Sequence, residues 1–314
     1  MTDIVVSVSD SLDPQGIANV LEMVTECTDA DGVSPFSEHV LLSVRHADGD
    51  GIKHIIAWRN GNVAGYAHLD LSQPLSGPSA ELAVRPFDRR HGIGTLLLSV
   101  LMSESRPGAL QLWAHGEEAS VGLLAHTFGF EKVRTLWQMR RPLLTRIDTP
   151  KWPDNITIRP FNPEIDISAW LACNARAFTD HPEQGRWQER DLCARMAEPW
   201  FDPNGFLIAA TTENRIAGFH WTKIHSPTDH NAHLNEPLGE VYIVGVDPDF
   251  QGSGLGKALV LEGLRHLRGE GLTTAMLYVD GEDERAISLY SSLGFVHWDS
   301  DTLYRDPLMP PASN

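Results

Sequence analysis

The order of apolar and polar positions divides the chain into two halves that use the same kinds of element. Helices are predicted where apolar residues recur at every third or fourth position, and strands where short apolar runs end in turn residues. In the first half, predicted helices begin near residues 14, 38, 96 and 119, and predicted strands cover residues 53–58, 63–69, 80–84, 109–113 and a run ending at Met139. In the second half, predicted helices cover residues 167–179, 189–196, 284–293 and a run from Ala258, and predicted strands cover residues 156–160, 206–210, 216–221, 240–246, 273–279 and a run after Phe295. Both halves therefore mix α and β structure.

The two halves also share short motifs in the same order, which indicates an internal duplication. The matched motifs are Val63–Tyr66 with Ile216–Phe219, Val84–Pro86 with Val246–Pro248, Gly92–Gly94 with Gly254–Gly256, and Phe128–Phe130 with Leu293–Phe295. Between the halves, residues 142–153 contain three prolines and mixed charge, which is typical of a linker. We therefore expect an N-terminal domain over residues 1–141, a linker over residues 142–153 and a C-terminal domain over residues 154–314.

One stretch of the second half, residues 244–257, has the composition of an anion-binding loop. A short apolar strand leads through a turn into Gly252-Ser253-Gly254-Leu255-Gly256 and then directly into a helix. Glycine removes the β-carbon that keeps a ligand away from the backbone, and the first amides of a helix have no intrahelical acceptor. The stretch therefore favours a phosphate-binding site, and a turn without any ligand is the alternative. Its glycine spacing matches neither a Rossmann fingerprint nor a Walker loop.

Composition narrows the classes of partner. The chain has 314 residues and a formal net charge of −17, which argues against a nucleic-acid partner and is compatible with a small cationic substrate. The three cysteines form no C-x-x-C pair and the histidines no H-E-x-x-H motif, so no metal site is predicted. Because the sequence has neither an apolar stretch of membrane-spanning length nor a secretory signal, we expect a cytoplasmic protein with no membrane partner, and a monomer.

Each half resembles the GNAT fold of acetyl-CoA-dependent N-acetyltransferases. The family signature Gln/Arg-x-x-Gly-x-Gly/Ala is present as Arg89-x-x-Gly92-x-Gly94 in the first half and as Gln251-x-x-Gly254-x-Gly256 in the second. The resemblance implies an α/β (α+β) chain of two tandem domains, each a mixed, mostly antiparallel twisted sheet flanked by helices. It also implies that the loop amides hold the pyrophosphate of acetyl-CoA, the co-substrate, while the preceding strand pairs with the pantetheine arm.

This resemblance assigns acetyl-CoA contacts to the strand and the loop of both halves, and to a later helix in the second half. In the C-terminal half the assigned residues are Val244, Gly245, Val246, Gln251, Gly252, Ser253, Gly254, Leu255, Gly256, Lys257, Asp283, Glu284, Arg285, Ala286, Ile287 and Ser288. In the N-terminal half they are Leu82, Ala83, Val84, Arg90, His91, Gly92, Ile93, Gly94 and Thr95.

Over nearly its whole length the sequence further resembles the mycothiol synthase family of tandem GNAT enzymes. The matching stretches are residues 31–38, 177–185, 220–223 and 239–248. The resemblance implies acetyl transfer to the cysteinyl amine of a pseudodisaccharide thiol, 1D-myo-inositol 2-(L-cysteinylamino)-2-deoxy-α-D-glucopyranoside, which gives mycothiol. The substrate contacts that it implies are Glu38, Glu183, Lys223, Glu240 and Tyr278. Because Glu38 comes from the first half, the resemblance implies a site between the two domains.

The same resemblance assigns Glu240 as the general base and Tyr290 as the general acid. An α-amine has a pKa of about 8, so a modest base is sufficient to make it nucleophilic. An ideal strand places Glu240 on the same face as Val246, although a bulge in that strand changes this. Aligning Val84 with Val246 places Pro78 opposite Glu240, and aligning Gly129 with Gly294 places Ala125 opposite Tyr290. We therefore expect the C-terminal half to be catalytic, and the N-terminal half to bind acetyl-CoA without turnover.

Two other functions are compatible with these features. A tandem GNAT that acetylates another amine, such as an aminoglycoside or a protein N-terminus, needs the glycine loop and Tyr290 but not Glu38, Glu183 or Lys223. A non-enzymatic acyl-CoA sensor needs neither catalytic residue, so the retained Glu240 and Tyr290 argue against it.

The cysteines bear on the route of transfer. Cys27, Cys173 and Cys193 have no His/Asp pattern nearby, and we expect all three to be buried thiols. This favours direct attack in a ternary complex over an acyl-cysteine intermediate.

Overall fold

The chain folds into two compact units, which share two of their strands. The computed structural model describes residues 4–46, 50–72, 77–105, 110–116, 119–179, 184–226 and 237–306. The N-terminal unit contains the described residues up to Trp137 together with residues 280–282 and 299–306, and the C-terminal unit contains residues 138–279 and 283–298. Within the described ranges, no helix is both long and apolar enough to cross a membrane.

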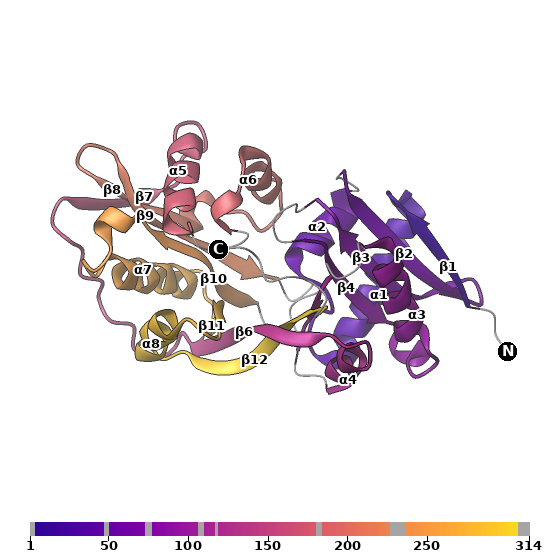
Figure 1. Ribbon diagram of the computed structural model, residues 1–314. Coiled ribbons are helices and arrows are strands. Elements are labelled where there is room, and N and C mark those ends of the chain that lie inside the picture. The colour runs from indigo at the N-terminus through magenta and orange to yellow at the C-terminus, as the bar shows by residue number, and fades with distance from the viewer. Residues whose placement is uncertain are drawn as a thin grey trace. The chain divides into compact units, whose positions relative to one another are not determined.

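In the N-terminal unit, helices cover both faces of a sheet with the strand order β1-β2-β3-β4-β5-β12 (Figure 1). Its strands are β1 (Ile4–Ser9), β2 (Ile52–Arg59), β3 (Asn62–Asp70), β4 (Ser79–Val84) and β5 (Gln111–Ala114). Its helices are α1 (Pro14–Asp31), α2 (Glu38–His46), the 3-10 turn η1 (Pro86–Asp88), α3 (Ile93–Glu104) and α4 (Ala119–Thr127). One core forms where α1 and α2 pack on the sheet, and a second core contains residues of α3 and α4. Among the described residues of this unit, β4 pairs parallel with β5, whereas β1 with β2, β2 with β3, β3 with β4, and β5 with β12 pair antiparallel.

Local sequence explains where several of these elements begin and end. Asp13 caps α1 by accepting a 2.7 Å hydrogen bond from Gly16 N, and Pro14 occupies the first turn, as predicted. The β2–β3 hairpin turns at Asn60 and Gly61, which have φ angles of 53° and 81°. Two consecutive positive φ angles are the geometry of the tight hairpin turn that Asn-Gly favours.

The C-terminal unit repeats this plan with the strand order β6-β11-β10-β9-β8-β7. Its strands are β7 (Ile156–Pro160), β8 (Phe206–Thr211), β9 (Ile216–His225), β10 (Leu238–Val246) and β11 (Thr274–Asp280). Its helices are α5 (Ile167–Ala177), α6 (Glu189–Met196), α7 (Leu255–Gly269) and α8 (Glu284–Ser292), with 3-10 turns η2 (Gln184–Arg186), η3 (Pro203–Gly205) and η4 (Pro248–Phe250). An aromatic core centred on Trp170 and Trp221 underlies α5 and α6, and a smaller core contains Leu255 and Leu259 of α7. The predicted mixed, mostly antiparallel sheet flanked by helices is thus present in each unit.

Two strands belong in part to each unit. β6 (Glu131–Pro142) lies in the N-terminal unit up to Trp137 and in the C-terminal unit from Gln138 onward, and β12 (Val296–Arg305) crosses in the opposite direction. The end of β12 pairs antiparallel with β5, from Thr302 opposite Ala114 to Arg305 opposite Gln111. β12 therefore completes the sheet of the N-terminal unit. Each compact unit consists of segments that are not contiguous in the sequence, so no single boundary position divides the chain into the two units. The predicted domain boundary at residues 142–153 stays a prediction.

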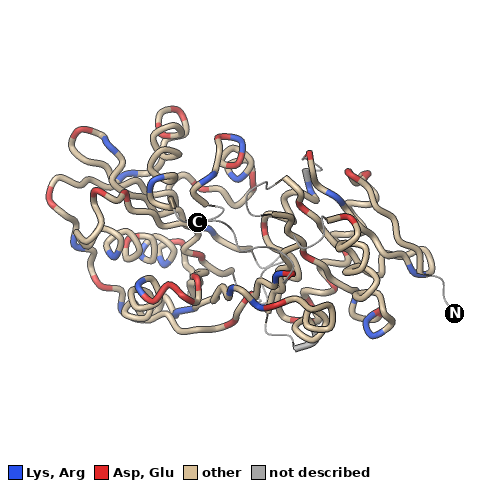
Figure 2. Tube along the Cα trace, in the orientation of Figure 1, with Lys and Arg blue, Asp and Glu red and all other residues tan. Residues whose placement is uncertain are grey.

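Charge is interspersed along both units. Figure 2 shows acidic and basic positions scattered along the described trace of both units. The net charge of −17 is therefore spread over many positions rather than concentrated in one described segment.

Candidate active site

Strand β10 is paired along its whole length on one side but only at its beginning on the other. It pairs with β9 from Leu238 opposite His225 to Val246 opposite Gly218. With the parallel strand β11 it pairs at only two positions, Gly239 with Ala275 and Glu240 with Met276. Beyond Glu240 the two strands separate, so the backbone of residues 243–246 has an edge without a ladder partner among the described strands. An extended amide-containing ligand can pair with such an edge.

A β-bulge at Tyr242 changes which way the side chains of β10 point. Val241 pairs with Thr222 and Ile243 with Trp221, so Tyr242 is the extra residue. Glu240 consequently lies opposite Lys223, and Val246 opposite Gly218, five positions away along β9. An odd separation means opposite faces of the sheet, so the simple expectation that Glu240 and Val246 share a face is wrong. The bulge is the cause.

The glycine loop has the backbone geometry of an anion site. Gly252 and Gly254 have φ angles of 77° and 85°, and α7 begins immediately afterwards at Leu255. Residues 251–254 are exposed, and no side chain caps the start of α7. The first amides of this 15-residue helix therefore face solvent with the positive end of the helix dipole. Loop and strand end are also joined, because Gln251 Nε2 donates to Val246 O over 3.5 Å.

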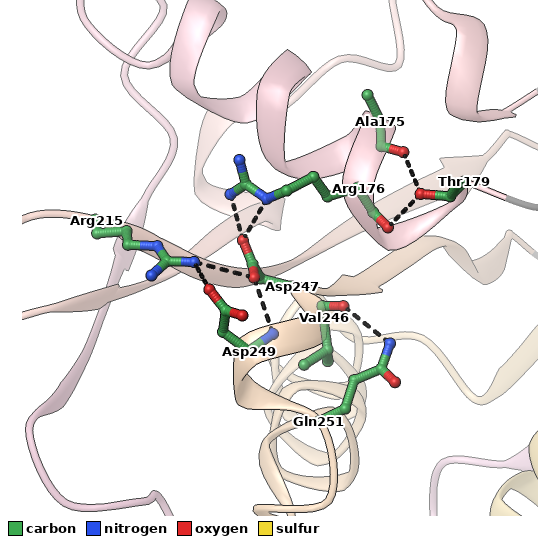
Figure 3. A network of polar contacts seen from close by, with 8 residues as sticks. All are labelled: Ala175, Arg176, Thr179, Arg215, Val246, Asp247, Asp249 and Gln251. Carbon is green, nitrogen blue, oxygen red and sulfur yellow. Dashed lines mark hydrogen bonds and ion pairs between the residues drawn. The ribbon is translucent and has the colours of Figure 1, made fainter.

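A buried carboxylate holds the turn between β10 and this loop (Figure 3). Asp247 is fully buried and accepts hydrogen bonds from Arg176 Nε at 2.9 Å and from an Arg215 terminal nitrogen at 3.1 Å. Arg215 also contacts Asp249, and Asp249 N donates to Asp247 at 3.1 Å. Burial opposes ionisation of Asp247, but these donors outweigh it and hold the pKa of the carboxyl below its ordinary value. Sequence reasoning did not identify Arg176 or Arg215, which lie far from the loop in the chain.

Glu240 has a buried imidazole partner. His225 Nε2 lies 2.7 Å from Glu240 Oε2, and the two side chains are only 4% and 8% exposed. Across the strand pair, the buried Lys223 ammonium lies 4.6 Å from the Trp200 ring centroid and 5.4 Å from that of Tyr242. The structure therefore brings the predicted residues Lys223 and Glu240 together. It adds His225, which lies beyond the predicted strand 216–221 but is the last residue of β9.

Tyr290 lies near the end of α8, whose first turn carries the other predicted acetyl-CoA contacts. Asp283 caps this helix by accepting from Ala286 N at 2.9 Å, and the Tyr290 ring makes an edge contact with Phe295 at 5.9 Å. Burial, with a smaller effect from the Asp283 charge, raises the pKa of Tyr290 to about 12. The phenol is therefore fully protonated at neutral pH, as a general acid must be.

The other predicted substrate contacts are dispersed. Tyr278 lies two positions beyond Met276 on β11, on the face that Glu240 shares, and its hydroxyl accepts a 2.9 Å hydrogen bond from Gln138. Glu38 is in the first turn of α2 in the N-terminal unit. Glu183 lies outside the described residues.

The N-terminal unit has the same loop with a different set of charges. β4 pairs with β5 only as far as Glu81 with Trp113, and α3 begins after Arg90 and Gly92, whose φ angles are 64° and 80°. Arg89 Nε donates to Val84 O at 3.0 Å, in the manner of Gln251 and Val246. Arg85 occupies the position of Asp247 in the alignment of the two units, and it pairs with Glu26 as Asp247 pairs with Arg176. The cation and the anion of this ion pair have therefore exchanged positions. The predicted contacts Leu82–Val84 and Arg90–Thr95 thus occupy a strand end and a helix start like those of the other unit.

The alignment of the two candidate sites needs one correction. The two units can be aligned on equivalent strand pairs, because Gly65 pairs with Val84 as Gly218 pairs with Val246. Five positions further along the neighbouring strand is Asp70 on β3 and Lys223 on β9, and Lys223 is the partner of Glu240. The residue opposite Asp70 is Ser79, not Pro78, because β4 lacks the bulge of β10. Ser79 therefore takes the place of Glu240. The residue predicted opposite Tyr290, Ala125, is fully buried in the core.

Glu81, on the same strand as Ser79, has a carboxylate whose two oxygens both have polar partners. Glu81 accepts 2.7 Å hydrogen bonds from both the backbone nitrogen and the hydroxyl of Ser37, and it lies 3.1 Å from His115 Nε2. His115 Nδ1 in turn lies 3.1 Å from Asp301 of β12. Burial lowers the pKa of His115, but the charges of Asp301 and Glu81 outweigh it and raise the pKa well above the ordinary value. No local sequence pattern marks this cluster, because its residues are far apart in the chain.

The cysteines only partly follow expectation. Cys27 and Cys173 are buried, and burial raises the pKa of their thiols to about 11 and about 12. Cys193 is exposed, so its predicted burial is wrong. It follows the inward-facing Leu192 on α6 and therefore points away from the core. Among the described residues, no group of three or more His, Cys, Asp or Glu side chains has the arrangement of a metal site.

The chain matches a family of acetyltransferases, which agrees with the geometry of the candidate site. The profile of the Acetyltransferase (GNAT) family matches residues 18–130 and 167–295, one match in each half of the chain. Curated relatives include the mycothiol acetyltransferase of Thermomonospora curvata, 47% identical over 307 residues with 96% of this chain and 97% of that protein covered. The mycothiol acetyltransferase of Acidothermus cellulolyticus is 46% identical over 302 residues, with 93% and 92% covered.

Solved structures with the same fold are more distant in sequence. A tandem GNAT protein from the clavulanic acid biosynthesis pathway superposes with a TM-score of 0.73 at 16% identity, covering 99% of this chain and 100% of that chain. A GCN5-related N-acetyltransferase from Sphaerobacter thermophilus gives a TM-score of 0.70 at 23% identity, with 98% and 96% covered. At these identities the likeness concerns the fold alone.

Proposed function

Because the chain belongs to the acetyltransferase (GNAT) family, we propose that it transfers the acetyl group of acetyl-CoA to the cysteinyl amine of 1D-myo-inositol 2-(L-cysteinylamino)-2-deoxy-α-D-glucopyranoside. The product is mycothiol. The observation that carries this proposal is the 42–47% identity, over 91–96% of the chain, to curated relatives named mycothiol acetyltransferase.

Acetyl-CoA binding in the C-terminal unit is supported by two neighbouring features of the backbone. The amides at residues 252–256 form an anion site for the pyrophosphate, and the open edge of Val244–Val246 can pair with the pantetheine amides. Residues 283–288, at the start of α8, would contact the arm from the other side. Together these features would direct the thioester towards the point where β10 and β11 separate, next to Glu240.

The chemistry follows from the two candidate catalytic side chains. The Glu240 carboxylate takes a proton from the substrate ammonium, and the amine nitrogen then attacks the thioester carbonyl carbon. As the carbon–sulfur bond breaks, the phenol of Tyr290 gives its proton to the departing thiolate, and the second proton that the nitrogen loses as the amide forms returns to the Tyr290 phenolate. This direct route needs no acyl-cysteine, and it agrees with the raised thiol pKa values of Cys27 and Cys173.

We assign the remaining polar contacts to the sugar and inositol. Carboxylates accept hydrogen bonds from hydroxyl groups, so Glu38 and Glu183 suit this role. The Lys223 ammonium donates to a hydroxyl or carbonyl oxygen, and its two aromatic neighbours limit its freedom before the substrate binds. Tyr278 can donate or accept.

We further propose that the N-terminal half, residues 1–141, binds acetyl-CoA without turning it over, and that the catalytic half, residues 154–314, follows the linker 142–153. The protein is proposed to work as a cytoplasmic monomer. The absence of turnover is argued from Ser79 and Ala125 in place of Glu240 and Tyr290, and from Glu81 being engaged by Ser37.

An acceptor panel tests the proposal against its alternatives. The purified protein is given acetyl-CoA with the cysteinyl pseudodisaccharide, an aminoglycoside or a peptide with a free N-terminus, and CoA release is followed. We expect kcat/KM for the pseudodisaccharide to exceed that for each other amine by at least about 100-fold, the discrimination expected when buried polar groups match one substrate. Equal or better use of another amine overturns the substrate assignment, and binding of acetyl-CoA with no acetylation of any amine favours a sensor.

A further inference from the structure

The buried contact between His225 and Glu240 has no role in the reaction described so far. Leu238 is the cross-strand partner of His225, and Lys223 is that of Glu240. Because side chains two positions apart on a strand share a face, His225, Lys223 and Glu240 all lie on the same face of the β9–β10 pair. The 2.7 Å separation of His225 Nε2 and Glu240 Oε2 is that of a strong hydrogen bond.

The chemistry of the two groups fixes which atom donates. An ionised carboxylate can only accept hydrogen bonds, so Nε2 of His225 must carry the hydrogen when Glu240 acts as a base. Among the described residues this is the only hydrogen bond that the Glu240 carboxylate makes, and it uses Oε2. Oε1 is therefore the atom that remains to meet the substrate amine.

The charged and polar groups around this pair come from three elements. Lys223 of β9 lies opposite Glu240, Tyr242 of β10 lies below the Lys223 ammonium, and Arg195 of α6 donates to the Tyr242 hydroxyl at 2.7 Å. Lys223 and Arg195 thus both contact the aromatic side chain of Tyr242, whereas Glu240 contacts the imidazole of His225. Each partner restricts a long side chain that would otherwise sample several rotamers.

We propose that His225 is a positioning residue for the general base: it donates from Nε2 to Glu240 Oε2 and so holds Oε1 in the direction of the substrate ammonium. This inference rests on the proposed function. A buried Glu that is fixed by a hydrogen bond reaches the amine without a search over rotamers, and such preorganisation lowers the barrier to proton transfer. His225 itself touches neither the substrate nor acetyl-CoA.

The test compares two replacements of which only one keeps a hydrogen-bond donor. His225→Leu removes the donor, whereas His225→Gln keeps an amide nitrogen near the place of Nε2. We expect His225→Leu to lower kcat about 10- to 100-fold, the effect of losing a hydrogen bond to a charged group. The KM for acetyl-CoA should stay within about 2-fold, because the glycine loop is untouched, and His225→Gln should recover most of kcat.

A second comparison removes the base itself. In the background of Glu240→Gln, the change His225→Leu should have no further effect on kcat, because the carboxylate that it positions is gone. His54→Leu is the matched control, since His54 is equally buried but contacts the Tyr66 hydroxyl in the N-terminal unit, and it should leave kcat within about 2-fold.

The outcomes separate this inference from the proposed function. If the unmodified protein forms no product, the proposed function fails. If it is active and His225→Leu keeps kcat within about 2-fold, or if Gln restores nothing, the positioning role is overturned. Should His225→Leu not fold, as judged by circular dichroism, the comparison of His225→Gln with His225→Asn decides, because the Asn amide lies near Nδ1 and only Gln should be active.

Discussion

At the scale of single residues, the candidate site consists of side chains that each contact one or two named partners. Glu240 is fixed by His225, Lys223 has aromatic neighbours, and Tyr290 has burial and the Asp283 charge to keep its proton. The residue types at Glu240 and Tyr290 were accessible to sequence reasoning because their motifs are local. Their partners were not, since His225 meets Glu240 only after the chain has passed through the segment between β9 and β10.

The raised pKa of Tyr290 predicts a particular pH profile. A phenol with a pKa of about 12 stays protonated up to that value, so its ionisation should cause no loss of kcat between pH 8 and about 10. Tyr290→Phe should lower kcat by about 100-fold or more at pH 8. Steady-state rates of both proteins across this range check the prediction. It is contradicted by a fall in the wild-type kcat near pH 9 that Tyr290→Phe abolishes.

At the scale of elements, two backbone devices create the acetyl-CoA site: the separation of β10 from β11 and the positive-φ glycines before α7. The glycine spacing made the loop predictable, because few residues other than glycine adopt φ angles near 80°. The bulge at Tyr242 was not predictable, since no residue type in residues 238–246 marks an extra position, and a one-residue error of alignment followed. For the same reason Pro78 rather than Ser79 was placed opposite Glu240.

Gly254→Ala tests the loop, with Gly269→Ala as its control. Gly254 has a φ of 85°, where a β-carbon costs about 1–2 kcal/mol, whereas Gly269 lies within α7 with nothing within 4 Å of an added β-carbon. We expect Gly254→Ala to lower the free energy of unfolding by about 1 kcal/mol and to raise the KM for acetyl-CoA. Gly269→Ala should leave the KM unchanged and stability equal or slightly higher. Equal KM values for the two variants would count against the loop as the pyrophosphate site.

Asp247→Asn tests the ion network that holds the same turn. The folded pKa of Asp247 lies below the ordinary value of 3.8, so its ionisation stabilises the fold above that pH, and the stabilisation is lost as the pH falls through the folded pKa. We expect the variant to lower the free energy of unfolding by about 1–3 kcal/mol at pH 7. The difference between variant and wild type should shrink below about pH 4, as measured by urea denaturation. A difference that is constant from pH 7 to pH 3 would refute this role of the carboxylate.

At the scale of the whole molecule, the duplication was predictable from the sequence. The exchange of strands between the units, in which β6 and β12 each lie partly in both, was not predictable. Four matched motifs are enough to show two copies of one fold, and the family profile confirms both. Sequence order does not say which sheet the last strand joins, however, and β12 pairs with β5 rather than staying wholly in the C-terminal unit. The cluster of Glu81, His115 and Asp301 forms only because β12, which carries Asp301, joins the N-terminal unit. A local sequence pattern could therefore not predict it.

The exchange predicts that the two halves do not separate when the chain is cut. A protease site introduced at residues 148–153, which have no helix or strand, should be cleaved without dissociation, because β12 of the second fragment stays paired with β5 of the first. Gel filtration of the cut protein under native conditions should give one peak that contains both fragments. Two separate folded fragments would contradict the pairing of β12 with β5.

The central claim, that this chain acetylates the cysteinyl amine by means of Glu240, is tested most directly by identifying the product. The wild-type protein and Glu240→Gln are each incubated with acetyl-CoA and the cysteinyl pseudodisaccharide, and the product is analysed by mass spectrometry before and after thiol alkylation. We expect the wild type to form a product with one acetyl group on nitrogen and a free, alkylatable thiol, and Glu240→Gln to form it at least about 100-fold more slowly. Acetylation on sulfur, no acetylated product, or equal rates for the two proteins would contradict the account.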